Sequence, residues 1–182
     1  MMRIVSTFLL LFMFATVVNA QGSPGGGSPG GGSSGTDDYT MAQLKKMEAE
    51  QSRTFVDQSE AATLSTKMSA LQAFDSAWNA RSLCTDPAAL AAGDALLNSG
   101  YAHYGAGENG EDQAGVESWL GDLDKSSGDF HMNEWEYAEA IFDYEDAIDC
   151  YADSLMWHDS ARSGYQLAKQ RYDEARVAYL TP

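Results

Sequence analysis

Three residue types of a catalytic triad stand next to one another in the last third of the chain, in the order His158, Asp159 and Ser160. A triad works only if the imidazole reaches both the carboxylate and the hydroxyl. On a helix, neighbouring side chains point in different directions and cannot converge in this way. The chain also contains no phosphate-binding loop or dinucleotide fingerprint. We therefore predict no catalytic residues and a protein that is not an enzyme.

Histidine, cysteine and carboxylate residues could also bind metal. His103 has no carboxylate or second histidine at helical ligand spacing, and His131 has only Glu134, so we do not expect a zinc or di-iron site.

Carboxylate and hydroxyl side chains alternate in the segment 122–134, DLDKSSGDFHMNE. Asp122, Asp124 and Ser126 follow the spacing of the first three oxygen ligands of a calcium loop, and the later glycine, hydrophobic residue and Glu134 keep their usual mutual spacing. The segment resembles an EF-hand loop that is one residue too long, because an extra serine separates its halves. The resemblance implies calcium as the one possible cofactor, bound by these four side chains. The alternative is an acidic helix–loop–helix connection.

The chain has two cysteines, Cys84 and Cys150, and neither has a second cysteine or a histidine at ligand spacing. In an exported protein, one disulfide bond between them is the simplest interpretation. Two free thiols or a metal-binding pair are the alternatives.

Residues 1–20 have the features of a secretory signal peptide: one basic residue, an apolar run and a small-residue end at Ala20. The apolar run is shorter than the roughly 20 residues that a membrane span needs. Residues 21–35 form a Gly/Ser/Pro-rich flexible linker, and residues 36–182 are long enough for one domain. We expect a secreted, extracellular protein, or a periplasmic one if the source is bacterial, with no membrane span.

Without residues 1–20, the chain has 10 basic and 27 acidic residues, a net charge of −17. Nucleic acids and anionic membrane surfaces are themselves negative, so they are not expected partners. A basic protein or a divalent cation remains compatible with this charge.

An aromatic residue recurs at every seventh position from Tyr137 to Tyr179, and a small residue, mostly alanine, follows three positions later. Alternating steps of three and four predict a helix that buries both positions against other helices. His158 replaces tyrosine once; it is either a packed, hydrogen-bonded residue or a pH-sensitive element. Small and polar residues at 160–164 predict a break or bend in this helix.

The remaining segments are also predicted to be helical. Residues 39–83 contain no glycine or proline and should form one long helix or two in tandem. Asp86 and Pro87 predict the start of a short helix that ends in a loop at 105–110, and a second short helix follows from Asp112.

These elements predict an all-α fold, an elongated antiparallel helical bundle or coiled-coil hairpin with two short helices between two long ones. If Cys84 bonds Cys150, the two long helices pack antiparallel, and residues before about 54 extend beyond the C-terminus. We expect the overhanging segment 41–53 to meet a partner.

The expected function is that of a secreted, non-enzymatic helical module that acts by protein binding or assembly, with a protein partner or self-association. A calcium-binding extracellular protein and a helical bundle that binds a small ligand are the two alternatives.

Overall fold

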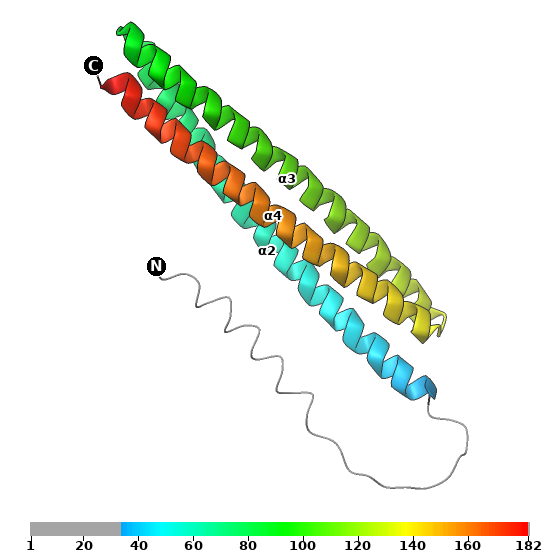
Figure 1. Ribbon diagram of the computed structural model, residues 1–182. Helices are drawn as coiled ribbons and strands as arrows, with labels where there is room; N and C mark the ends of the chain where they lie inside the picture. Colours follow the sequence, from blue (N-terminus) through cyan, green and yellow to red (C-terminus); the bar gives the residue numbers. More distant parts are fainter. Residues whose placement is uncertain (1–33, 182) are drawn as a thin grey trace, which may run out of the picture. The chain divides into compact units, whose positions relative to one another are not determined.

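The computed structural model describes residues 34–181, which form three helices: α2 (Ser34–Leu83), α3 (Pro87–Asn133) and α4 (Tyr137–Leu180). Figure 1 shows the three helices side by side. Residues 34–181 contain no strand, which confirms the all-α prediction. The predicted signal peptide (1–20) and all but the last two residues of the predicted linker (21–35) lie outside the described residues.

Local sequence explains the two short connections. Asp86 is the N-cap of α3 and accepts a hydrogen bond from the backbone N–H of Ala89 at 2.9 Å, and Pro87 occupies the first helical position, as predicted. Between α3 and α4, Trp135 has a φ of 68°, a left-handed conformation that reverses the chain. The backbone N–H of Glu136 then donates to the carbonyl of His131 at 2.9 Å.

Contacts between rings define the direction of α2 relative to α4. The rings of Tyr39 and Tyr137 lie 5.2 Å apart near the start of both helices, and those of Phe74 and Tyr172 lie 5.3 Å apart near the end. The two helices are therefore parallel, and α3 runs antiparallel to both (Figure 1).

The prediction of two short helices between two long ones is wrong. The chain continues as one helix of 47 residues through 105–110, where we expected a loop. The antiparallel packing that we inferred from a Cys84–Cys150 bond is also wrong, because α2 and α4 run parallel. Glycines were interpreted as helix breakers, but in α3 they have a packing role.

Five glycines of α3 face tyrosines of α4. At Gly107, a Cβ atom would lie 2.7 Å from the ring of Tyr165, closer than side-chain carbons approach one another. The same relation recurs at intervals of seven residues, with one position skipped between Gly107 and Gly121: Gly93 with Tyr179, Gly100 with Tyr172, Gly121 with Tyr151, and Gly128 with Tyr144. Only glycine leaves room for these rings.

Burial of the tyrosines stabilises the fold by more than the glycines destabilise helix α3. Each glycine in a helix costs about 1 kcal/mol relative to alanine. A tyrosine buries on the order of 150–250 Å², which at about 25 cal/mol per Å² is worth roughly 4–6 kcal/mol before entropy. The five tyrosines opposite glycine are at most 4 % exposed, so the burial gain exceeds the helix penalty.

The heptad of α4 is buried as predicted: the tyrosine positions from Tyr144 to Tyr179, including His158, and the small-residue positions from Ala140 to Ala175. The predicted break at 160–164 does not occur, and α4 is one helix of 44 residues. Gly164 has a different role there, since a Cβ atom at this position would lie 2.7 Å from the backbone nitrogen of Gly107. The two helix backbones approach closely at this point.

Helix α2 contributes a seam of small residues to the same core. Ala42, Ala49, Val56, Ala70 and Ala77 are all fully buried at seven-residue intervals or multiples of them. Burial of the first two shows that the predicted overhang of 41–53 is wrong: this segment packs beside the first half of α4.

Among residues 34–181, no helix is both long and apolar enough to cross a membrane.

The close approach of α3 and α4 predicts opposite effects for two glycine substitutions. Gly164→Ala should lower the free energy of unfolding by roughly 1–3 kcal/mol, because the new methyl group meets backbone that cannot move aside. Gly105→Ala, where a Cβ atom has nothing within 4 Å, should raise it by up to about 1 kcal/mol. Urea unfolding followed by circular dichroism measures both. Equal effects of the two substitutions would contradict the close backbone contact.

Candidate functional site

A repeated arrangement of four residues, which we call a rung, crosses the three helices. In one rung, Tyr151 of α4 packs on Gly121 of α3 and donates a hydrogen bond to Asp122 at 2.7 Å; the same carboxylate accepts from Arg53 of α2 at 2.9 Å. Three further rungs have the same composition: Tyr144, Gly128, Asp129 and Lys46; Tyr165, Gly107, Glu111 and Lys67; and Tyr179, Gly93, Asp94 and Arg81. Each joins a tyrosine, a carboxylate and a cation.

In the rung of Tyr144, the pKa values of the tyrosine and the carboxylate are shifted in opposite directions. Partial burial would raise the pKa of Asp129, but hydrogen bonds from Lys125, Lys46 and Tyr144 outweigh it and lower that pKa to about 2. Burial and the hydrogen bond to Asp129 raise the pKa of Tyr144 well above its ordinary value. At neutral pH the tyrosine is therefore the donor and the carboxylate is ionised.

In one rung, aromatic residues replace both the cation and the carboxylate. Tyr172 packs on Gly100, and the rings of Phe74 and Tyr101 lie 5.3 and 6.0 Å away, where other rungs have a cation and a carboxylate. Burial, with the neighbouring tyrosines, raises the pKa of Tyr172 to about 12.

The rung at His158 differs in all four members. Histidine replaces tyrosine, and Ala114 occupies the seven-residue position of the glycines. Gly115 stands where the carboxylate would be, and Glu60 stands where α2 otherwise has a cation or Phe74. Ala114 is fully buried here, and Glu60 and Gly115 cannot form the ion pair that joins α2 and α3 in four other rungs.

A cleft of about 280 Å³ opens at this rung. Its lining residues come from all three helices: Glu60, Glu111, Gly115, Ser118, Trp119, Asp122 and His158. Two of its three carboxylates, Glu111 and Asp122, already bind Lys67 and Arg53.

Thr63 of α2 holds the imidazole of His158. The Thr63 hydroxyl donates to the carbonyl of Ser59 at 2.9 Å and lies within hydrogen-bond distance of Nδ1 of His158, at 3.3 Å. The same oxygen accepts from the guanidinium of Arg162 at 3.4 Å. Burial lowers the pKa of His158; Glu60 opposes that shift and Arg162 adds to it.

The structure does not assemble the three triad residue types. His158 is buried and hydrogen-bonded to α2, whereas Asp159 is exposed and pairs with Arg162. Ser160 lines a separate hollow beside Trp157.

The four predicted calcium ligands are not arranged as a loop. Asp122, Asp124 and Ser126 lie within α3, and Glu134 is its C-cap. The hydroxyl of Ser126 donates to the backbone carbonyl of Asp122 at 2.7 Å, and Asp124 accepts from the thiol of Cys150 at 3.7 Å. Within residues 34–181, no group of three or more His, Cys, Asp or Glu side chains is placed to hold a metal ion. The expected loop is absent because Gly128 serves Tyr144 instead of a sharp turn.

The predicted disulfide bond is also absent, and Cys84 and Cys150 are both free. Cys84 follows α2 close to Arg81, which the rung of Tyr179 places near the end of α4. From Tyr179 back to Cys150 is about 43 Å at 1.5 Å per residue. Parallel packing of α2 and α4 separates the two thiols, whereas the predicted antiparallel packing would have joined them.

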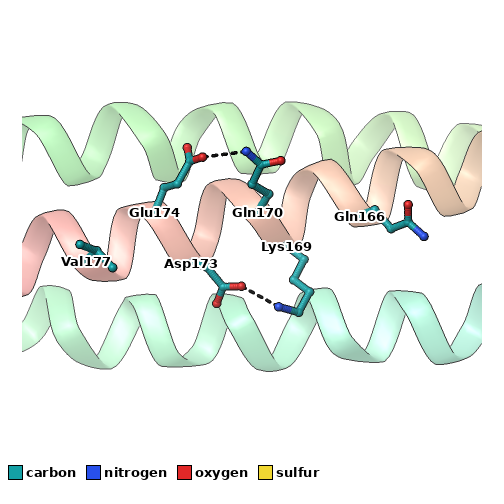
Figure 2. Close-up of a pocket in the computed structure, with 6 residues that line it drawn as sticks. All are labelled: Gln166, Lys169, Gln170, Asp173, Glu174 and Val177. Atoms are coloured by element: carbon teal, nitrogen blue, oxygen red, sulfur yellow. Dashed lines mark hydrogen bonds and ion pairs between the residues drawn. The ribbon is translucent and has the colours of Figure 1, made fainter. Parts of the chain in front are cut away.

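Two other hollows are less suited to a ligand. Figure 2 shows one of about 550 Å³ on α4 alone, where Lys169 pairs with Asp173 and Gln170 with Glu174. Four of its polar side chains are already paired with one another. All of its lining residues belong to α4, so no second helix encloses the hollow. The other lies at the α3–α4 connection and is lined partly by Tyr39, Trp135 and Tyr137.

Sequence reasoning missed Glu60 and Gly115, although a signal for both was present. Lys46, Arg53, Lys67 and Arg81 stand at multiples of seven residues, and Glu60 and Phe74 interrupt that series. Recognising the series required knowing that α3 is one helix whose acidic residues face it.

Comparison of the chain with models of known protein families, with curated protein sequences and with solved structures found no match.

The depressed pKa of Asp129 predicts a loss of stability in acid. A carboxylate whose pKa is lower in the folded than in the unfolded state stabilises the fold above its ordinary pKa, and this contribution disappears as pH falls towards about 2. The Tm of the wild type should fall between about pH 4 and pH 2, and Asp129→Asn should fall less over that range while being less stable at pH 7. Asp153→Asn, at an exposed position of α4, is the control. Parallel pH profiles for Asp129→Asn and the wild type would refute the contribution.

The free thiols predict a particular alkylation pattern. Burial, with the nearby Asp124, raises the pKa of Cys150 to about 11, so at pH 8 its native thiol should react slowly with iodoacetamide. After unfolding without a reducing agent, both cysteines should be modified, as measured by mass spectrometry. A protein that resists modification until it is reduced would instead contain the disulfide bond.

Proposed function

We propose that this protein is a secreted, non-enzymatic helical module that acts by binding another protein or by assembly. The observation that carries the proposal is an outer stripe on α3. Its members recur at helical spacing and are all exposed: Val116, Leu120, Leu123 and Phe130, with Trp119 beside them. We call these five residues the α3 stripe.

The α3 stripe has the pattern of a helix-packing face without a helix on it. The spacing i, i+4, i+7 and i+14 places its members on one side of α3, away from the buried glycines Gly121 and Gly128. In the described structure Trp119 is 60 % exposed and Phe130 is 59 % exposed. Exposed apolar groups in one contiguous row are typical of a protein-interaction surface.

Aromatic residues extend this surface towards the α3–α4 connection. Trp135 is 78 % exposed and lies near Tyr137, with 6.3 Å between ring centres. Tryptophan and tyrosine are the residues that most often dominate the binding energy of protein interfaces. Their presence beyond the end of the stripe favours a protein partner that covers both.

Charge indicates the character of the partner. Between 111 and 129, α3 carries six acidic residues and one basic residue, Lys125. A partner helix with an apolar face and basic flanks would match this pattern. A second copy of the chain would have to overcome repulsion between two strongly negative molecules, so salt should strengthen self-association.

The features of residues 1–20 support export, and the acidic balance is compatible with an extracellular or periplasmic setting. The triad residue types that do not converge support a role without chemistry of its own. Calcium binding by the segment 122–134 remains a prediction, which calorimetry with calcium would check.

Sedimentation equilibrium of residues 21–182 tests the assembly form of the proposal. We expect a mass above that of the monomer at high protein concentration, increasing with salt, and a monomer for Leu123→Glu. Val177→Glu adds the same charge at a comparably exposed position of α4 and should leave the mass unchanged.

A wild type that stays monomeric would eliminate self-assembly and leave the partner form. A photo-crosslinking residue at Leu120 should then capture a partner from the native secretions that the same residue at Val177 does not. Equal capture from both positions, or none, would contradict the proposal.

A further inference from the structure

The rung at His158 lacks the cation that four of the other five rungs have. Four α2 residues at this heptad position, Lys46, Arg53, Lys67 and Arg81, pair with carboxylates of α3. At the corresponding position α2 has Glu60, whose carboxylate forms no ion pair with the other described residues. At this rung α2 therefore presents a hydrogen-bond acceptor, the carboxylate of Glu60, where four other rungs have a lysine or arginine as donor.

Of the three carboxylates that line the cleft, only Glu60 has no ion-pair partner among the described residues. Glu111 and Asp122 add negative charge from the α3 side, although each also binds a cation of α2. His158 is only 3 % exposed and lies on the wall of the cleft. A carboxylate without a partner cation can accept strong hydrogen bonds from a charged donor.

The chemistry of the lining excludes several classes of ligand. Three carboxylates disfavour an anion. A metal ion would need three or more ligands in position, and the described residues provide no such group. A volume of about 280 Å³ suits one small group and not an extended molecule.

An organic cation fits the remaining features. Trp119 lies on the wall of the cleft, and its ring can attract a cation as other rings of this protein do. Lys67 Nζ lies 5.6 Å from the ring centre of Tyr165, and the guanidinium of Arg81 lies 5.3 Å from that of Trp78. An ammonium or guanidinium group would also donate hydrogen bonds to the carboxylate of Glu60.

We propose that the cleft formed by Glu60, His158 and Trp119 binds one ammonium or guanidinium group, contributed by a lysine or arginine side chain of a basic protein partner. The inference rests on the proposed binding function and identifies a specific contact within it. Trp119 belongs both to the cleft and to the α3 stripe, so one partner helix can cover the stripe and insert a basic side chain.

Binding of n-butylguanidinium, observed by NMR on the whole mature protein, tests the cleft without any partner. The indole N–H of Trp119 and the backbone N–H of Gly115 should shift together and saturably, whereas the indole N–H of Trp157, which lines another hollow, should not. Uniform small shifts at all acidic positions would show only a diffuse counterion atmosphere and would overturn the proposal.

A substitution of Glu60 and a matched control test the role of its charge. Glu60→Gln should weaken binding about tenfold, because it replaces a charge-assisted hydrogen bond by a neutral one. Asp153→Asn removes the same charge from an exposed position of α4 and should leave binding unchanged. If Glu60→Gln binds the probe as the wild type does, the proposal is wrong.

A second variant restores the ordinary rung. Glu60→Lys together with Gly115→Asp should create an internal ion pair, since a Cβ atom at 115 has nothing within 4 Å. This variant should fold with a Tm at least equal to that of the wild type and should no longer bind n-butylguanidinium. Undiminished binding would place the ligand elsewhere.

Binding of a peptide tests whether the cation belongs to a protein side chain. A helical peptide with one arginine between leucines spaced three and four residues away should bind at least about tenfold more tightly than n-butylguanidinium, since it also covers the stripe. Leu123→Glu should remove that advantage and keep the binding of the small probe. Equal affinities would overturn the assignment to a protein side chain. Association in solution without any shift at Trp119 would contradict the cleft and leave the proposed function intact.

Discussion

The rings of five tyrosines in α4 occupy the space that side chains of α3 would otherwise fill, and this contact sets the spacing of the whole helical unit. Because α3 presents glycine to each ring, α3 and α4 approach until the backbone at Gly107 meets Gly164. The hydroxyls of four of these tyrosines then reach carboxylates on α3, and those carboxylates reach the cations of α2. Packing and electrostatics are thus parts of one arrangement, in which a larger residue at any of these glycines would separate the helices.

The periodic features of α4 and the start of α3 could be predicted from the sequence, because they depend on local rules. The seven-residue pattern identifies the buried face of α4, and Asp86 with Pro87 identifies the start of α3. The continuity of α3 could not be predicted in the same way. A glycine has no side chain from which to read a preference for a face, and its low helix propensity argues for a loop. Only the tyrosines of another helix explain why these glycines are helical.

That misinterpretation also affected a predicted site. With a loop at 122–134, Asp122, Asp124, Ser126 and Glu134 resembled calcium ligands, whereas in the helix Asp122 belongs to a rung. The Cys84–Cys150 bond was predicted separately, from the presence of two cysteines, and the parallel arrangement of α2 and α4 separates the two thiols. His158 was recognised as an exception in its series, but its partners Glu60 and Gly115 became visible only when three series, one on each helix, were aligned.

The two atypical rungs have a consequence for how the helices find their alignment. Four rungs of one composition would be nearly as well satisfied if α3 slipped by seven residues along its neighbours. The rung of His158 removes this ambiguity: such a slip would place Glu60 opposite Asp122 or Glu108, and a tyrosine ring against the methyl group of Ala114. The aromatic rung, with Phe74 and Tyr101, would likewise leave a lysine or arginine facing a phenol. The irregular positions therefore define the register of the three helices, because they make one alignment of a periodic sequence lower in energy than the alignments shifted by seven residues.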